Sequence, residues 1–204
     1  MNHYYSKAPE APSDRGRVEA RIHGIDLSFI TDSQVFSKNH IDFGTRLMLE
    51  SAIGDLNERK IGRGRFLDLG CGYGTVGIAM KRVFPALEVF MADINERAIE
   101  LARENASMNH AGAATIFESD GFSSVEGMFD VIMTNPPVRA GKQTVYSFFE
   151  GAFARLNEGG LFYAVLQKKQ GAPSAQDKLT ALFGACEVIG KDAGYRVFRC
   201  VRED

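Results

Sequence analysis

Short apolar runs alternate with amphipathic stretches along most of this chain. The runs at residues 66–69, 87–92 and 129–133 are too short for helices, and polar residues or glycine end each of them, so they predict buried strands. Between them, apolar residues recur every three or four positions, which predicts helices that pack one face on a core. Strands and helices in this alternation indicate an α/β fold built on a mostly parallel sheet.

The same pattern places the remaining elements. Helices are predicted at residues 45–56, 75–84, 96–109, 143–156 and 174–183, and further strands at 113–118 and 161–167. Residues 187–190 and 195–201 predict an antiparallel pair that closes the sheet. Residues 19–22 and 25–30 alternate apolar and polar side chains around a His-Gly pair, which predicts a β-hairpin. We therefore expect an arm and hairpin at residues 1–34, appended to a main domain at 35–204.

Composition narrows the class of protein. A chain of 204 residues, 45% hydrophobic and 25% charged, is expected to form one globular domain, and no apolar run is long enough to span a membrane. Residues 1–18 contain prolines and charges without an apolar block, so we expect no signal peptide. Three cysteines without metal-ligand spacing indicate reduced thiols in a cytoplasmic protein without a metal site. A net charge of −2 gives no general attraction to nucleic acid.

A glycine-rich turn joins the strand at 66–69 to the helix that follows. Gly70, Gly72 and Gly74 let the backbone turn sharply and approach a ligand closely, and the helix N-terminus beyond them offers unpaired N–H groups. With Gly77 and Asp93, this turn also satisfies a dinucleotide-binding pattern. However, a carboxylate at the end of the strand would repel a pyrophosphate and would suit a cationic ligand, such as the amino group of a methionine moiety. The sequence therefore predicts a nucleotide-like ligand that carries a positive charge.

Polar residues also follow the next three strands. Asp93 is placed to accept hydrogen bonds from ribose hydroxyls, or to cap the next helix. Asp120 precedes Gly121, so it either accepts from an adenine amine or belongs to a simple turn. The Asn135-Pro136-Pro137 segment is stiff, because proline holds the residue before it out of helical geometry. We expect all of these side chains at the carboxyl ends of the strands, where open α/β sheets bind ligands.

These motifs together resemble class I S-adenosylmethionine (SAM) methyltransferases over about residues 35–201. The resemblance rests on Asp68-x-Gly70-x-Gly72-x-Gly74 and the later strand-end motifs in the same order. It implies a Rossmann-like fold, with a mostly parallel seven-stranded sheet and an antiparallel closing strand. It also implies SAM as cofactor. The implied cofactor-binding residues are Asp68, Gly70, Gly72, Gly74, Asp93, Ile94, Asp120, Gly121 and Asn135.

A narrower resemblance comes from two further segments. Residues 36–45 and 135–142 are similar to segments of the small-domain methyltransferases, and most similar to 16S ribosomal RNA guanine-N2 enzymes. In that family the first segment lies over the cofactor, which makes Asp42, Gly44 and Thr45 candidate cofactor neighbours, although Asp42 is equally suited to cap a helix. Family members usually carry a second, N-terminal copy of the domain and an aromatic residue after the two prolines. The 204 residues contain no second copy, and Val138 stands at that position.

The resemblance implies a direct mechanism. Asn135 Oδ1 and the Pro136 carbonyl would accept the two N–H bonds of a target amine and so direct its lone pair toward the methyl group. The expected substrate-binding residues are Pro137, Val138, Arg139 and Lys142, with Lys168 and Lys169 on the same rim. The expected partner is ribosomal RNA, free or within the small ribosomal subunit. A protein glutamine methyltransferase and a SAM-binding regulator without turnover stay open as alternatives, and the oligomeric state is not predicted.

Overall fold

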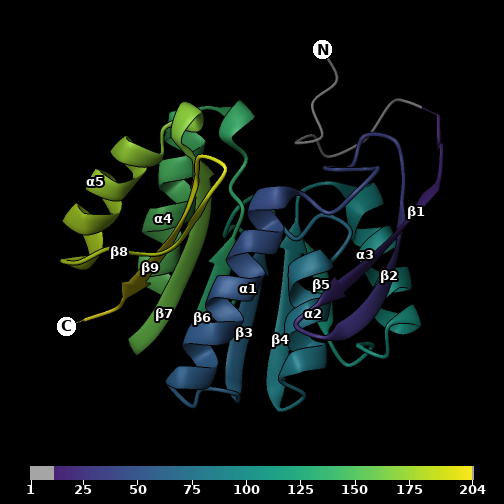
Figure 1. Cartoon of the computed structure of the whole chain (residues 1–204), viewed down its shortest axis with the longest axis horizontal. Coiled ribbons are helices and arrows are strands. Elements are labelled where there is room, and N and C mark those ends of the chain that lie inside the picture. The colour runs from purple at the N-terminus through teal and green to yellow at the C-terminus, as the bar shows by residue number, and fades with distance from the viewer. Residues whose placement is uncertain (1–11, 204) are drawn as a thin grey trace.

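A computed structural model describes residues 12–203, and residues 1–11 of the predicted N-terminal arm lie outside the described residues. A seven-stranded sheet forms the centre of the molecule (Figure 1). Its spatial order is β5-β4-β3-β6-β7-β9-β8, and all neighbours are parallel except at β9, which is antiparallel to both β7 and β8. The strands are β3 Gly64–Leu69, β4 Leu87–Asp93, β5 Thr115–Glu118, β6 Phe129–Thr134, β7 Leu156–Gln167, β8 Glu187–Asp192 and β9 Tyr195–Val201.

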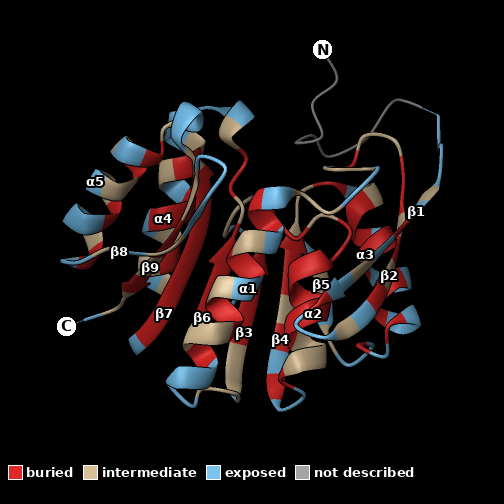
Figure 2. Cartoon of the chain, in the orientation of Figure 1, coloured by how far each residue is buried: buried red, intermediate tan, exposed pale blue. Residues whose placement is uncertain are grey.

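Helices cover both faces of this sheet. On one face lie α1 Phe43–Glu58, α2 Thr75–Val83 and α3 Glu96–Met108, and on the other lie α4 Lys142–Arg155 and α5 Ala172–Phe183. Successive strand residues alternate between the two cores, so Phe66 packs with the first group and Leu67 with the second. The central strands β3, β4, β6 and β7 are buried along most of their length, as Figure 2 shows, whereas the edge strands β5 and β8 are not. The predicted Rossmann-like α/β fold is confirmed.

The order of the strands locates a ligand crevice. The chain runs from β3 outward to β4 and β5, and then returns to place β6 on the other side of β3. At such a reversal the following loops diverge and leave a crevice outside the carboxyl ends of the strands. The short 3-10 helices η1 Val138–Ala140 and η2 Lys168–Gln170 follow β6 and β7 at this same edge.

The prediction for residues 156–160 was wrong. The sequence predicts a helix to residue 156 and a strand that starts at residue 161, but α4 ends at Arg155 and β7 begins directly at Leu156. The reason is the antiparallel neighbour, because Arg202 exchanges backbone hydrogen bonds with Gly159 and Gly160 at 2.7 and 2.9 Å. A register irregularity opposite Phe129–Val131 accommodates the additional residues.

The predicted hairpin is confirmed as β1 Gly16–Ile22 and β2 Ile25–Thr31. His23 and Gly24 both have positive φ, as a two-residue hairpin turn requires. Its inner side chains, including Ile22 and Phe29, are fully buried against the helices on the first face of the sheet. Within residues 12–203, no helix is long and apolar enough to cross a membrane.

Two asparagines, one in α3 and one at its C-cap, attach the hairpin to the main domain. Asn105 accepts the Ile30 N–H at 2.7 Å and donates to the Ile30 carbonyl at 2.9 Å, as a neighbouring strand would. One helical turn later, Asn109 makes the same pair of bonds with Ser28, at 3.0 and 2.7 Å. The free edge of β2 is therefore satisfied by side chains in a region where unpaired backbone groups would be costly.

The far end of α1 is also anchored. Asp55 accepts a hydrogen bond from Tyr163 on β7 at 2.6 Å and from Arg199 on β9 at 2.6 Å. Both partners are themselves largely shielded from solvent, since Tyr163 is fully buried and the Arg199 side chain is 10% exposed. Since β7 and β9 belong to the central sheet, these bonds fix where the N-terminal end of α1 meets the crevice.

We expect Asn105→Ala to lower the free energy of unfolding by about 2–4 kcal/mol. The substitution leaves the Ile30 N–H and carbonyl without partners and also removes the bond from Asn105 Nδ2 to the Tyr73 carbonyl. Urea denaturation followed by circular dichroism measures the change. The neighbouring exposed Glu104→Ala is the control and should change it by less than about 0.5 kcal/mol. Equal stabilities of the two variants would contradict the assigned role of Asn105.

Candidate active site

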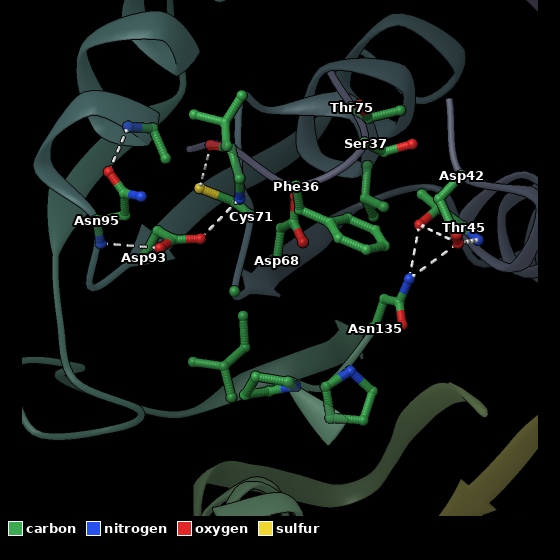
Figure 3. Close-up of a pocket in the computed structure, with 18 of the residues that line it drawn as sticks. Phe36, Ser37, Asp42, Thr45, Asp68, Cys71, Thr75, Asp93, Asn95 and Asn135 are labelled. Carbon is green, nitrogen blue, oxygen red and sulfur yellow. Dashed lines mark hydrogen bonds between the residues drawn. The ribbon is translucent and has the colours of Figure 1, made fainter. Parts of the chain in front are cut away.

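A cavity of about 270 Å³ opens at the carboxyl ends of β3, β4 and β6. Its walls come from the segment before α1, from the glycine loop, and from the residues after β4 and β6 (Figure 3). Of the site residues predicted from sequence, those that line the cavity are Asp42, Thr45, Asp68, Gly70, Gly72, Asp93, Ile94, Gly121, Asn135, Pro136, Pro137, Val138 and Arg139.

The glycines of the first motif have separate tasks. Gly70, Gly72 and Gly74 all have positive φ, and Gly74 is the N-cap residue of α2 rather than part of the cavity wall. Gly77 instead allows α2 to lie close to β4, because a Cβ at this position would be 2.3 Å from Met91 Sδ. The spacing that resembles a dinucleotide pattern thus includes one glycine needed for helix packing.

Asp68 is a buried carboxyl group at the end of β3. Its side chain is 2% exposed, and its Oδ2 accepts the Gly77 N–H at 2.8 Å. Burial raises the pKa of Asp68 to about 7 in spite of this bond, and the neighbouring charge of Asp93 raises it further. Because a nearby cation would favour the ionised form, the site is suited to a positively charged ligand group.

Asp93 holds the glycine loop and faces the cavity. Its two oxygens accept the N–H groups of Gly72 at 2.8 Å and Asn95 at 2.9 Å. Burial raises the pKa of Asp93, and these N–H bonds oppose the rise. The residue that caps α3 is Asn95, which accepts the Ala98 N–H at 3.2 Å. The capping role that Asp93 was considered for is therefore filled by another side chain.

The amide of Asn135 is held by two side chains from the start of α1. Asn135 Nδ2 donates to Asp42 Oδ2 at 3.1 Å and to Thr45 Oγ1 at 2.9 Å, as the dashed lines in Figure 3 mark. Asp42 is also the N-cap residue of α1, because Oδ2 accepts the Thr45 N–H at 2.9 Å. The capping role considered for Asp42 is thus observed, together with a contact to Asn135.

These contacts fix which end of the Asn135 amide points away from Asp42 and Thr45. The Asp42 carboxylate can only accept hydrogen bonds. The Thr45 hydroxyl already donates its proton to Asp42 Oδ2 at 3.3 Å, so toward Asn135 it can only accept as well. Both partners therefore require a donor from Asn135. A flipped amide would place Oδ1 against the carboxylate. Asn135 Oδ1 therefore points away from Asp42 and Thr45 and is presented as an acceptor (Figure 3).

The neighbouring carbonyl of Pro136 already accepts one hydrogen bond within the chain. Pro136 O accepts the Val138 N–H at 2.8 Å across a tight turn at Pro137, whose φ and ψ are −75° and 76°. A carbonyl oxygen has two lone pairs, so one direction remains for a ligand. Asn135 and Pro136 both line the cavity, so the stiff Asn-Pro-Pro segment offers an amide oxygen and a backbone oxygen on its wall.

Besides Gly74, the predicted site residues Asp120 and Lys142 lie outside the main cavity. Asp120 is exposed and lines a second hollow, which shares Gly121 and Phe148 with the first. The Lys142 Nζ lies 5.2 Å from the centre of the Tyr146 ring, on the solvent side of η1 and α4. Gly121 joins the two hollows, so Asp120 remains adjacent to the cavity.

Sequence reasoning missed lining residues from the C-terminal half. Phe148 comes from α4, Gln170 from η2 and Tyr195 from the start of β9, and no motif marks any of them. The antiparallel pairing of β7 with β9 brings Tyr195 opposite Gln167 at the carboxyl end of β7. A correct register for the predicted closing pair would have placed this tyrosine at the crevice.

Comparisons with known proteins agree with this geometry. The family model described as methyltransferase small domain matches residues 26–199. The chain is 42% identical over 199 residues to the uncharacterized protein YbxB of Bacillus subtilis, covering 97% of this chain and 96% of that protein. It is 35% identical over 177 residues to ribosomal RNA small subunit methyltransferase C of Actinobacillus pleuropneumoniae, covering 85% of this chain and 51% of the relative.

A solved structure is also similar. It is the T. thermophilus 16S rRNA N2 G1207 methyltransferase in complex with AdoMet and guanosine, with a TM-score of 0.84 and 28% identity. The match covers 96% of this chain and 52% of that one, so the chain spans about half the length of the curated ribosomal RNA methyltransferases it matches. Since the family model accounts for most of the described residues, the chain belongs to the methyltransferase small domain family.

Proposed function

We propose that this protein transfers a methyl group from SAM to the exocyclic N2 of a guanine in 16S ribosomal RNA. The observation that carries the proposal is the fixed amide of Asn135, which presents an acceptor oxygen beside a cavity that contains the buried carboxyl group of Asp68 and the half-buried one of Asp93. The similarity to a guanine-N2 methyltransferase solved with AdoMet and guanosine supports the choice of cofactor and base.

The residues present fit SAM. Asp68 would pair with the amino group of the methionine moiety, and Asp93 would accept hydrogen bonds from the ribose hydroxyls. Ile94, Gly121 and Asp120 would surround the adenine at the junction of the two hollows. The glycine loop leaves its backbone close to the ligand because no Cβ projects from Gly70 or Gly72.

The catalytic task of the chain is alignment. Bound SAM supplies a sulfonium methyl group that is already activated toward nucleophiles. Asn135 Oδ1 and the Pro136 carbonyl would accept the two N–H bonds of the target amine, which turns its lone pair toward the methyl carbon. The same two oxygens stabilise the positive charge that develops on nitrogen as the N–C bond forms and the C–S bond breaks. The amine proton then passes to water, and S-adenosylhomocysteine remains.

Basic side chains near the cavity mouth support an RNA substrate. Arg139 lines the cavity and is exposed, and Lys142, Lys168 and Lys169 are exposed at the start of α4 and in η2. These positions surround the carboxyl ends of β6 and β7, where phosphates next to an extruded base would lie. Local charge of this kind compensates for the net charge of −2.

A protein glutamine methyltransferase is the second candidate. The same pair of oxygens would hold the two N–H bonds of a side-chain carboxamide, so the amide geometry does not separate the two substrates. The similarity to ribosomal RNA methyltransferases and the basic rim favour RNA.

The product distinguishes these functions. The protein is incubated with methyl-labelled SAM and either small ribosomal subunits or translation-factor proteins, and the hydrolysed products are separated by mass spectrometry. We expect the label in N2-methylguanosine. Label in methylglutamine alone would transfer the proposal to the second candidate, and binding of SAM without transfer to either substrate would favour a regulator.

The buried carboxyl group of Asp68 predicts a pH dependence of cofactor binding. Its pKa of about 7 in the free protein means that a cationic ligand must bind the less populated ionised form at lower pH. The affinity for S-adenosylhomocysteine should therefore fall by up to about tenfold per pH unit below pH 7 and level off above it. Calorimetric titration from about pH 5.5 to about pH 8 measures the slope.

Asp68→Asn is the matched control for this measurement. The variant keeps the size of the side chain but has no carboxyl group to ionise, so its weaker binding should vary little with pH. If the variant retained the parental slope, another group, with Asp93 the nearest candidate, would be responsible.

The fixed amide predicts a separation of turnover from cofactor binding. Asn135→Ala should lower kcat by about two to three powers of ten, because it removes a contact made to the reacting amine. Thr45→Val should lower kcat by about tenfold, since Asn135 loses one of the two hydrogen bonds that hold its amide in place. Both should bind S-adenosylhomocysteine within about threefold of the parental protein.

Thr45→Ser is the control, because it keeps the hydroxyl group that accepts from Asn135. Its kcat should stay close to the parental value. Equal losses in Thr45→Val and Thr45→Ser would show that the methyl group of Thr45 matters and not its contact to Asn135.

A further inference from the structure

A planar base next to Asn135 needs a flat apolar surface, and the Asn-Pro-Pro segment does not provide an aromatic one. Val138, which follows the two prolines, is branched and half-buried. Four aromatic side chains line the cavity, namely Phe36, Tyr73, Phe148 and Tyr195. Phe36 comes from the segment before α1 and projects into the cavity (Figure 3), and the neighbours of the other three rings locate them on its wall.

Two of these rings, Phe148 and Tyr73, pack against other parts of the cavity wall. Phe148 lies beside the glycine loop, because Cβ atoms at Gly70 and Gly121 would be 3.7 and 3.6 Å from its ring. This is the region assigned to the cofactor. Tyr73 is buried and its hydroxyl donates to the Ser37 carbonyl at 3.4 Å, so it packs beneath the segment before α1.

Tyr195 stands at the Asn135 end. A Cβ at Gly44 would lie 2.7 Å from Tyr195 Cε1 and 3.1 Å from Asp42 Oδ2, the same oxygen that holds the Asn135 amide. The Tyr195 ring and the Asp42 carboxylate are therefore both close to Gly44. Burial and the charge of Asp42 both raise the pKa of Tyr195, so the ring stays neutral at physiological pH.

A second aromatic ring, that of Phe43, packs against the Tyr195 ring. The ring of Phe43 lies 5.6 Å away between centres, at an angle of 40°, and Phe43 is itself 44% exposed. Residue 44 must be glycine for the Tyr195 ring to lie where it does, because any side chain there would collide with the ring. Tyr195 is half-buried, so part of its ring remains accessible, and an accessible aromatic ring is suited to stacking against a base.

The backbone under Tyr195 is rigid. Ala193 and Gly194 form a two-residue turn with positive φ at both positions, which is the geometry that hairpins favour. Tyr195 pairs with Gln167 on β7, and the Lys168 N–H donates to the Gly194 carbonyl at 2.7 Å. The ring is thus presented from the sheet itself rather than from a loose loop.

We propose that the target base stacks on the ring of Tyr195 while its amine faces Asn135, with Phe43 supporting the ring. This inference rests on the proposed function and adds the surface that selects a planar base. It also gives a reason for an aromatic residue at the start of β9, which the motifs at the other strand ends do not explain. A stacked purine would lie between the β8–β9 turn and the Asn-Pro-Pro segment, with its edge toward the two acceptor oxygens.

Kinetics with two substitutions test the role of the ring. Tyr195→Leu should lower kcat/KM for the RNA by roughly ten- to hundredfold, the scale of one lost base–aromatic stack. Tyr195→Phe keeps the ring and should stay within about threefold of the parental protein. Both variants should bind S-adenosylhomocysteine as the parental protein does, which shows that they are folded with an intact cofactor site. A parental kcat/KM in Tyr195→Leu would overturn the proposal.

A fluorescence experiment reads the stacking without turnover. The chain contains no tryptophan, so Tyr195→Trp introduces a single reporter at the proposed surface. Guanosine added in the presence of S-adenosylhomocysteine should quench this tryptophan in a saturable manner. Met128→Trp is the matched control, because Met128 is 39% exposed and precedes β6 at the opposite end of the sheet. Equal responses of the two reporters would overturn the proposal.

The two experiments also separate this inference from the proposed function. If the parental protein transferred no methyl group to RNA, the proposed function would fail, and saturable quenching in Tyr195→Trp alone would still support base stacking. If the parental protein produced N2-methylguanosine and Tyr195→Leu did so at the parental rate, the function would stand and the stacking would be refuted.

Discussion

One carboxylate oxygen connects the parts of this site. Asp42 Oδ2 accepts the backbone N–H and the hydroxyl of Thr45 in the first turn of α1, and it also accepts from the amide of Asn135, which directly follows β6. Helix start and strand end are therefore held together across the mouth of the cavity. The acceptor oxygen of Asn135 faces outward because this carboxylate leaves the amide only one orientation.

Contacts elsewhere in the molecule hold Asp42 and Asn135 at this distance from each other. Asp55, at the other end of α1, is bonded to β7 and β9, so the helix cannot slide along the sheet. Asn105 and Asn109 attach β2 to α3, and the segment between β2 and α1 is thereby drawn over the cavity. A hairpin remote in sequence from the strand-end motifs thus contributes to the position of the wall that faces them.

The fold could be predicted because its signals are local. Buried runs ended by Gly70, Asp93 and Asn135 predict strands and their polar ends, and parallel topology then gathers those ends at one edge. Contacts between distant segments could not be predicted in this way. The pairing of Asn135 with Asp42 and the arrival of Tyr195 depend on the docking of α1 and on the register of β9, which a single sequence does not specify. The division of the chain at residue 34 stays a prediction.

The most direct test of the account is a structure of the protein crystallised with S-adenosylhomocysteine and guanosine. The account predicts that the N2 amine of guanine lies within hydrogen-bonding distance of Asn135 Oδ1, while Asn135 Nδ2 still donates to Asp42 and Thr45. A guanosine whose amine points away from Asn135, or an Asn135 amide that has released Asp42 to donate to the base, would contradict it.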